Sequence, residues 1–188
     1  TVTGVAKFLD VTGTGKVIIN GTKDGAAIKM TTNCREVGGD TGIVYLDAAG
    51  ADVTCNGGDY YSKETSDVGS TYSVFCVKDG SLKLNAVTAE AGKSTDVVDC
   101  GETNSSASVE IHGGSFKASG SNSGVIDCDS KGTIYNATLE MHNGGNYVLA
   151  VGGSSAELKI YNSTVVGENK SSCVTVQYGG GGGGGGWG

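Results

Sequence analysis

The chain has 188 residues, enough for one domain with a core, and is 37% hydrophobic and 18% charged, with 34 glycines and no proline. This composition is typical of short strands joined by polar turns rather than of helices. The net charge of −7 and the single arginine, Arg35, argue against a nucleic-acid partner, and no apolar stretch reaches the roughly 18–20 residues that membrane insertion needs.

Residues 1–12 form a strand-like segment that lies outside the clear repeats. We interpret this segment as an N-terminal cap or as a docking strand for a neighbouring copy. A stack of strands ends in unpaired backbone groups, which need a cap or invite the addition of another chain. Val5, Phe8 and Leu9 are the predicted contact residues.

From residue 13 to residue 178 the sequence repeats an alternating apolar triplet followed by a polar turn and another apolar residue, as in 109–116 and 158–165. A single repeat cannot bury its apolar side chains, so we expect the repeats to stack at the strand spacing of about 4.8 Å. The equivalent anchor positions, spaced by 23–36 residues, are Ile19, Cys55, Leu84, Ile111, Ile134 and Ile160.

A second strand motif lies between the anchors, at 72–76, 96–100, 124–128 and 147–150. Strand alternation places Val98 and Cys100 on the core side and Asp99 on the other. The predicted inward column of this motif is Cys76, Cys100, Cys128 and Ala150. A stack of turn amides is predicted at Asn20, Asn85, Asn136 and Asn162.

The Ile-x-Gly-Gly-x-Phe turn at 111–116 and the Ile-x-Asn-x-Thr-Val turn at 160–165 resemble those of right-handed parallel β-helices. That class includes pectate-lyase-like proteins and the passengers of bacterial autotransporter adhesins. The repeats predict about six coils. The resemblance implies an all-β solenoid, a right-handed parallel β-helix, and carries no particular function. Because the first repeat is irregularly spaced, a Greek-key β-sandwich of the pilin type is the alternative fold.

The resemblance also raises the question of polysaccharide cleavage. Lyases of this class use an acidic calcium site with a basic residue, usually arginine, but Arg35 adjoins no carboxylate cluster. The related hydrolases carry Gly-His-Gly and Arg-x-Lys patterns, whereas His112 follows Ile111 and no Arg-x-Lys exists. No catalytic residue and no metal ligand is therefore predicted.

The remaining acidic candidates are Asp99, Asp127 and Asp129. If Asp99 stacks over Asp127, the pair could raise one pKa, bind a cation or act as an acid–base pair. We favour the interpretation that these side chains face outward and are solvated. A calcium ion bridging Asp127 and Asp129 is the only cofactor left open.

The six cysteines form no C-x-x-C pair, which argues against a structural zinc site. We interpret the cysteines as buried residues. Cys34 and Cys55 are one candidate disulfide pair. The even cysteine count and five N-glycosylation sequons favour an extracellular or cell-surface location. The candidate glycosylated residues are Asn20, Asn104, Asn136, Asn162 and Asn169.

The chain ends in a glycine-rich tail, residues 179–188, which contains the only tryptophan, Trp187. Eight consecutive glycines cannot pack a core and are typical of a flexible tether. We interpret Trp187 as a candidate anchor on a neighbouring subunit.

Together these features predict a non-catalytic structural subunit of an extracellular fibril or surface appendage, which associates head-to-tail into a homopolymer. The alternative is an adhesin or glycan-binding module. Less favoured is a polysaccharide lyase or hydrolase, in which Asp99→Ala or Asp127→Ala would abolish cleavage. The sugar-stacking rings of the glycan-binding alternative would be Tyr60, Tyr61, Tyr135 and Tyr161.

Overall fold

The computed structural model describes residues 2–3, 7–23, 26–27, 29–32, 41–62, 72–93, 95–101, 105–168 and 172–176. Within these ranges every regular element is a β-strand. No helix in the described part of the chain is long and apolar enough to cross a membrane.

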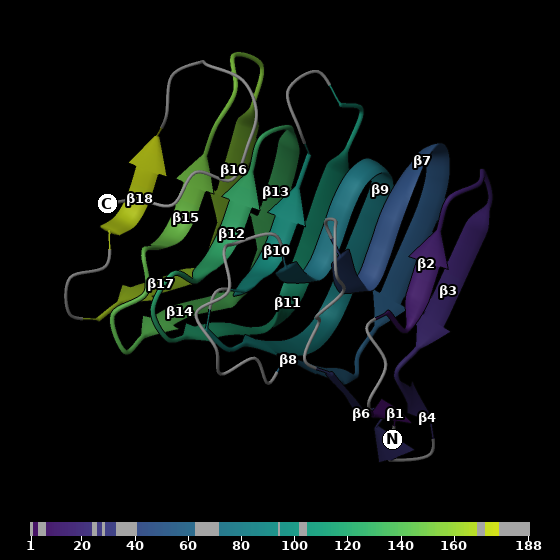
Figure 1. The fold of residues 1–188 in the computed structure, drawn as a ribbon, viewed down its shortest axis with the longest axis horizontal. Helices are drawn as coiled ribbons and strands as arrows, with labels where there is room; N and C mark the ends of the chain where they lie inside the picture. The colour runs from purple at the N-terminus through teal and green to yellow at the C-terminus, as the bar shows by residue number, and fades with distance from the viewer. Residues whose placement is uncertain are drawn as a thin grey trace.

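The strands form three stacks, here called faces A, B and C, which the chain visits in turn (Figure 1). Face A contains β2 (Leu9–Val11), the start of β7 (Thr41–Asn56), the start of β9 (Tyr72–Ala91), β10 (Thr95–Cys100), β12 (Gly124–Cys128), β15 (Tyr147–Val151) and β18 (Ser172–Val176). Face B contains β3 (Lys16–Asn20), the end of β7, the middle of β9, the start of β11 (Ser108–Ser119), β13 (Lys131–Tyr135) and β16 (Glu157–Tyr161).

Face C contains β1 (Val2–Thr3), β6 (Lys29–Thr32), β8 (Asp59–Ser62), the end of β9, the end of β11, β14 (Thr138–His142) and β17 (Thr164–Gly167). Residues 72–167 wind through the three faces four times, and residues 9–62 carry two earlier strands on each face. The first and last strands of the stack lie at its opposite ends (Figure 1).

Every strand pair in the three faces is parallel. Among the described residues, only β4 (Thr22–Lys23) and β5 (Ala26–Ala27) pair antiparallel. The predicted all-β parallel solenoid is therefore confirmed, although its complete turns in the described residues number four rather than about six. The Greek-key β-sandwich, which requires antiparallel pairing, is wrong.

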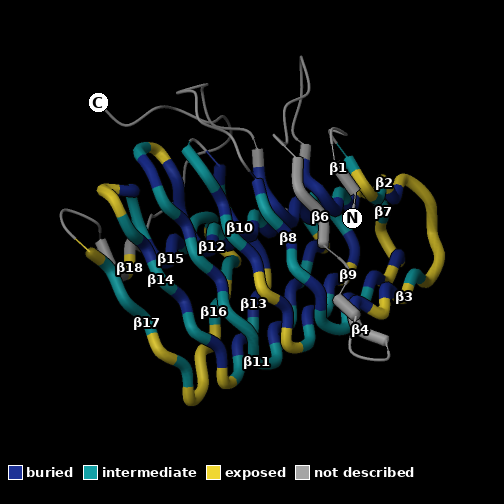
Figure 2. The backbone as a smooth tube through the Cα atoms, turned by 90° about the horizontal axis from the view of Figure 1, so that it is seen from below, coloured by how far each residue is buried: buried dark blue, intermediate teal, exposed yellow. Residues whose placement is uncertain are grey.

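The anchor positions predicted from the repeats form one continuous column on face B. Adjacent strands align Ile19 with Cys55, Cys55 with Leu84, and so on to Ile160, without a shift in register at these positions. The side chains from Cys55 to Ile134 in this column are fully buried, because each lies between equivalent residues of the coils before and after it. Figure 2 shows buried stretches recurring from coil to coil through the middle of the stack, with exposed residues gathered at turns and at its end.

The cysteine column of face A differs from the prediction by one residue. Cys100 does pair with Cys128, but it faces Val77 rather than Cys76 in the preceding strand. Likewise Cys128 pairs with Val151 and not with Ala150. The alternation of apolar and polar residues does not fix the register of these strands. Val97 and Val98 are both completely buried, as are Val125 and Ile126, so a shift by one residue leaves the apolar pattern unchanged.

Four cysteines in the described part of the chain are buried free thiols, which confirms their place in the core: Cys55, Cys76, Cys100 and Cys128. Because Cys55 carries a free thiol, the candidate disulfide with Cys34 is wrong. Cys34 itself and the side chain of Cys173 lie outside what the structure describes.

Tyr60 fills the core at face C instead of lying on the surface. Its ring packs on Phe75 at 4.9 Å between centroids and 55° between planes, and the residue is fully buried. Its assignment to a sugar-stacking face is therefore wrong. The buried hydroxyl has no hydrogen-bond partner of adequate geometry, and its pKa is raised, first by burial and then by the neighbouring Cys55 thiol.

We expect Tyr60→Phe to raise the free energy of unfolding by about 1 kcal/mol, because it removes a buried polar group that lacks a good partner. A thiol is only a weak acceptor and compensates little of the lost hydration. Urea unfolding followed by circular dichroism measures the change, with exposed Tyr161→Phe as the control that leaves stability unaltered. A less stable Tyr60→Phe would show that the hydroxyl is bonded after all.

Candidate interaction surfaces

The C-terminal end of the stack exposes residues that occupy core positions in every earlier coil. Val174 of β18 is 58% exposed, whereas its partner Leu149 and the preceding residue of the column, Ile126, are 1% or less exposed. On face B, Ile160 is 37% exposed although Ile134 next to it is fully buried. Two apolar core columns thus end in solvent-accessible side chains.

The N-terminal end presents β2, which pairs with β7 alone among the described strands. Phe8 is 38% exposed, and its backbone N–H donates to the carbonyl of Ile43 at 2.8 Å. Leu9 is partly buried and aligns with Val44. Phe8 and Leu9 therefore lie at the end of the stack, while the other two predicted contact residues, Val5 and Trp187, lie outside the described residues.

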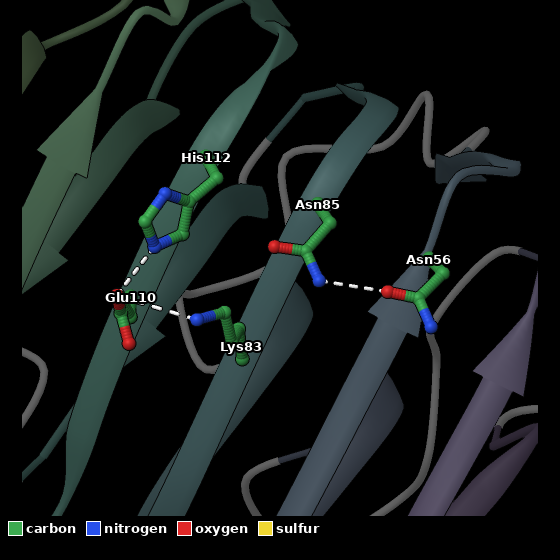
Figure 3. A network of polar contacts seen from close by, with 5 residues as sticks. All are labelled: Asn56, Lys83, Asn85, Glu110 and His112. Carbon is green, nitrogen blue, oxygen red and sulfur yellow. Dashed lines mark hydrogen bonds and ion pairs between the residues drawn. The ribbon is translucent and has the colours of Figure 1, made fainter.

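A ladder of asparagine amides runs along the outer side of face B. The Asn85 Nδ2 group donates to Asn56 Oδ1 at 2.7 Å (Figure 3). The Asn56 Nδ2 group in turn donates to Asn20 Oδ1 at 3.0 Å. The predicted amide stack is correct for Asn20 and Asn85 and missed Asn56 between them. Each amide satisfies the next, so the ladder ties the first three coils of this face together.

The other two asparagines of the predicted stack do not join the ladder. Asn136 and Asn162 follow one position later, in the turn to face C, with φ values of 55° and 48°. Asparagine tolerates this left-handed conformation better than most residues, which accounts for its recurrence at the turn.

Aromatic rings continue the same column beyond the asparagines. The rings of His112 and Tyr135 stack at 4.9 Å and 19°, and those of Tyr135 and Tyr161 stack at 5.0 Å and 11°. These rings face one another along the stack, and Tyr61 lies on face C. The four tyrosines considered for sugar stacking therefore do not share one surface.

Beside this column lies a charged network. Glu110 Oε1 contacts His112 Nε2 and, at 3.4 Å, Lys83 Nζ (Figure 3). The His112 contact, followed by the Lys83 charge, lowers the pKa of Glu110. The network borders a shallow hollow of about 420 Å³ on face B. Polar residues lining this hollow include Thr54, Ser81, Ser108 and Thr133.

The acidic residues singled out from the sequence behave differently from one another. Asp99 and Asp127 are in register on adjacent strands, as considered, and Asp99 Oδ2 lies 4.0 Å from the Cys76 thiol. Asp127 is not freely solvated: it is partly buried and accepts a hydrogen bond from the Tyr147 hydroxyl at 3.1 Å. Burial, and then the charge of Asp129, raise its pKa.

The described residues contain no group of three or more His, Cys, Asp and Glu side chains placed to hold a metal ion. Arg35, the basic residue weighed for lyase chemistry, lies outside them. His142 pairs with Glu168 through Nδ1 at 2.8 Å and with Glu140 through Nε2 at 3.2 Å. Glu168 and then Glu140 raise the pKa of His142.

Three of the five sequon asparagines fall in described segments. Asn136 and Asn162 are exposed at equivalent turns of adjacent coils, and Asn20 is exposed with its amide oxygen engaged by Asn56. Asn104 and Asn169 lie outside these segments. Glycosylation of all five stays a prediction.

No protein-family model, no curated protein and no solved structure matches the chain.

Proposed function

We propose that this chain is a non-catalytic structural subunit of an extracellular fibril or surface appendage, and that copies associate head-to-tail through the ends of the solenoid. The observation that carries the proposal is Val174, a core-position residue that is 58% exposed at the last strand of face A. Burying such a side chain against a further strand is favourable by about 1.5 kcal/mol or more.

The two ends of face A are complementary. β18 pairs with β15 alone and β2 with β7 alone among the described strands, so each has one backbone edge that can accept a parallel strand. Addition of β2 of a second copy to β18 would bring Leu9 over Val174 and continue the apolar column. Because the two contacting surfaces differ, the association does not close and generates a filament.

The test is Val174→Lys, which places a charge where the next copy would bury an apolar side chain. We expect wild-type protein to form filaments, seen by negative-stain electron microscopy and light scattering, and the variant to need at least about tenfold higher concentration to do so. Thr133→Lys is the matched control, because Thr133 points outward from the middle of face B.

Circular dichroism confirms that the Val174→Lys variant is folded before assembly is compared. A wild-type protein that stays a monodisperse monomer, or a Val174→Lys variant that assembles like wild type, would contradict the proposal. A monomer would instead favour the polar hollow of face B and a glycan-binding role.

A further inference from the structure

Three consecutive strands of face A meet at a single hydroxyl group. Tyr147 in β15 places its Oη atom 3.1 Å from Asp96 Oδ2 in β10 and 3.1 Å from Asp127 Oδ2 in β12. Neither Asp96 nor Tyr147 carries a sequence pattern that marks it as functional. Their contact joins residues that are 51 positions apart in the chain.

Gly124 is the residue that lets the tyrosine reach Asp96. It aligns with Tyr147, and a Cβ atom at this position would lie 2.0 Å from the Tyr147 ring and 2.7 Å from Asp96 Oδ1. The absence of a side chain at Gly124 therefore opens the space that the cluster occupies. The Gly124 backbone N–H also donates to Asp96.

The arrangement has too few hydrogens if both carboxyl groups are ionised. A phenol carries one hydrogen and can donate to one acceptor, yet two carboxyl oxygens lie at the same distance from it. The second contact is a hydrogen bond only when one carboxyl group holds a proton and donates it to the phenol oxygen. Burial, followed by the two aspartate charges, raises the pKa of Tyr147 well above its usual value, so the phenol keeps its hydrogen.

We propose that Asp96, Asp127 and Tyr147 form a proton-operated clasp that holds β10, β12 and β15 together, closed while the two carboxyl groups share one proton and open when both are ionised. This inference does not depend on the proposed head-to-tail association. β15 is also the partner of β18, so opening of the clasp loosens the attachment of the last strand of face A.

The charges around the clasp act in the same direction. Burial and then Asp127 raise the pKa of Asp96, while burial and then Asp129 raise that of Asp127. Asp99, in register with Asp127, adds a further acidic group on the neighbouring strand. The Tyr147 hydroxyl and the backbone N–H groups of Gly124 and Cys128 oppose these effects without cancelling them.

A carboxyl group with a raised pKa keeps its proton in the folded state after the unfolded chain has released it. The contribution of the protonated carboxyl groups to the free energy of unfolding is present in full below the ordinary aspartate pKa of about 4. It is lost as pH rises towards and through the raised pKa. The clasp therefore predicts that stability falls from mildly acidic to neutral and alkaline pH.

The experiment is urea unfolding of the full chain between pH 4.5 and pH 8.5, with Asp96→Asn and Tyr147→Phe beside the wild type. For the wild type we expect the unfolding equilibrium constant to rise by about tenfold or more across this range, since one pKa unit corresponds to a factor of ten. In Asp96→Asn the amide keeps a donor to the phenol oxygen and does not titrate, so most of the rise disappears. Asp52→Asn, exposed on face B, is the control and keeps the wild-type slope.

A second measurement covers the case in which the variants do not fold. A carbon-13 NMR titration of the carboxyl groups in wild-type protein is expected to show two aspartates titrating well above the ordinary range. The protection of the β15 amides from hydrogen exchange, measured relative to the intrinsic exchange rate at each pH, is expected to fall over the same pH interval. A flat wild-type stability profile, an Asp96→Asn variant as steep as wild type, or carboxyl groups that all titrate in the ordinary range would overturn the clasp.

Discussion

Phe116→Ala is expected to lower the free energy of unfolding by about 4 kcal/mol, in the range for large buried aromatic side chains. Phe116 is fully buried and aligns with Ala89 on one side and Leu139 on the other. The small Ala89 separates it from Tyr60 in the same column. A second alanine at 116 would leave two small residues in succession, and the rigid neighbouring backbone could not close the cavity.

The matched control is Phe8→Ala, which removes the same side chain from a position that is 38% exposed. Its expected effect is below about 1 kcal/mol in the monomer, because less apolar surface is returned to water. Urea denaturation of both variants at one pH gives the comparison. Equal losses at the two positions would contradict the assignment of Phe116 to the core.

Gly114→Ala is expected to destabilise the chain by more than about 3 kcal/mol, or to prevent folding. Gly114 has φ of +100°, and a Cβ atom there would lie 2.2 Å from the backbone oxygen of Val87, its partner in the preceding coil. Backbone atoms cannot move aside as a flexible side chain would. Either the turn or the pairing between the coils must therefore be disrupted.

The adjacent glycine supplies the control. Gly113 also has a positive φ, +68°, but the nearest atom to an added Cβ is 3.9 Å away. The equivalent position of the next coil is Asn136, with φ of 55°. Gly113→Asn should therefore alter stability by less than about 1 kcal/mol. Thermal unfolding of the two variants distinguishes backbone collision from strain in φ, and similar losses in both would refute the collision.

The column from Ile19 to Ile160 could be predicted from the sequence because it lies on a face with one buried side. There the apolar and polar residues alternate, and a slip of one residue would move every anchor to the surface. The parallel stacking followed from the same repeats, since one coil cannot bury its own apolar side chains.

The register of face A was harder to predict, because apolar residues on both sides of its central strands are buried. Val97 and Val98 are equally apolar and equally inaccessible, so the alternation that fixes register elsewhere is missing. The sequence pattern therefore aligns Cys76 with Cys100, whereas Cys76 pairs with Asp99 in the structure. The Asp96–Tyr147 contact passes through the space that a side chain at position 124 would fill. No local sequence pattern indicates which residues make contact through such a space.

The direction of the backbone hydrogen bonds has a mechanical consequence. They run from each coil to the next, so a pull on the two ends of the solenoid loads them one after another rather than together. Ile134 and its partner Ile160 are 26 positions apart, and that much chain extends to about 85–95 Å once released. A fibre made from such subunits would lengthen under tension as single coils unfold one at a time. Each unfolded coil would dissipate mechanical work before the fibre ruptures.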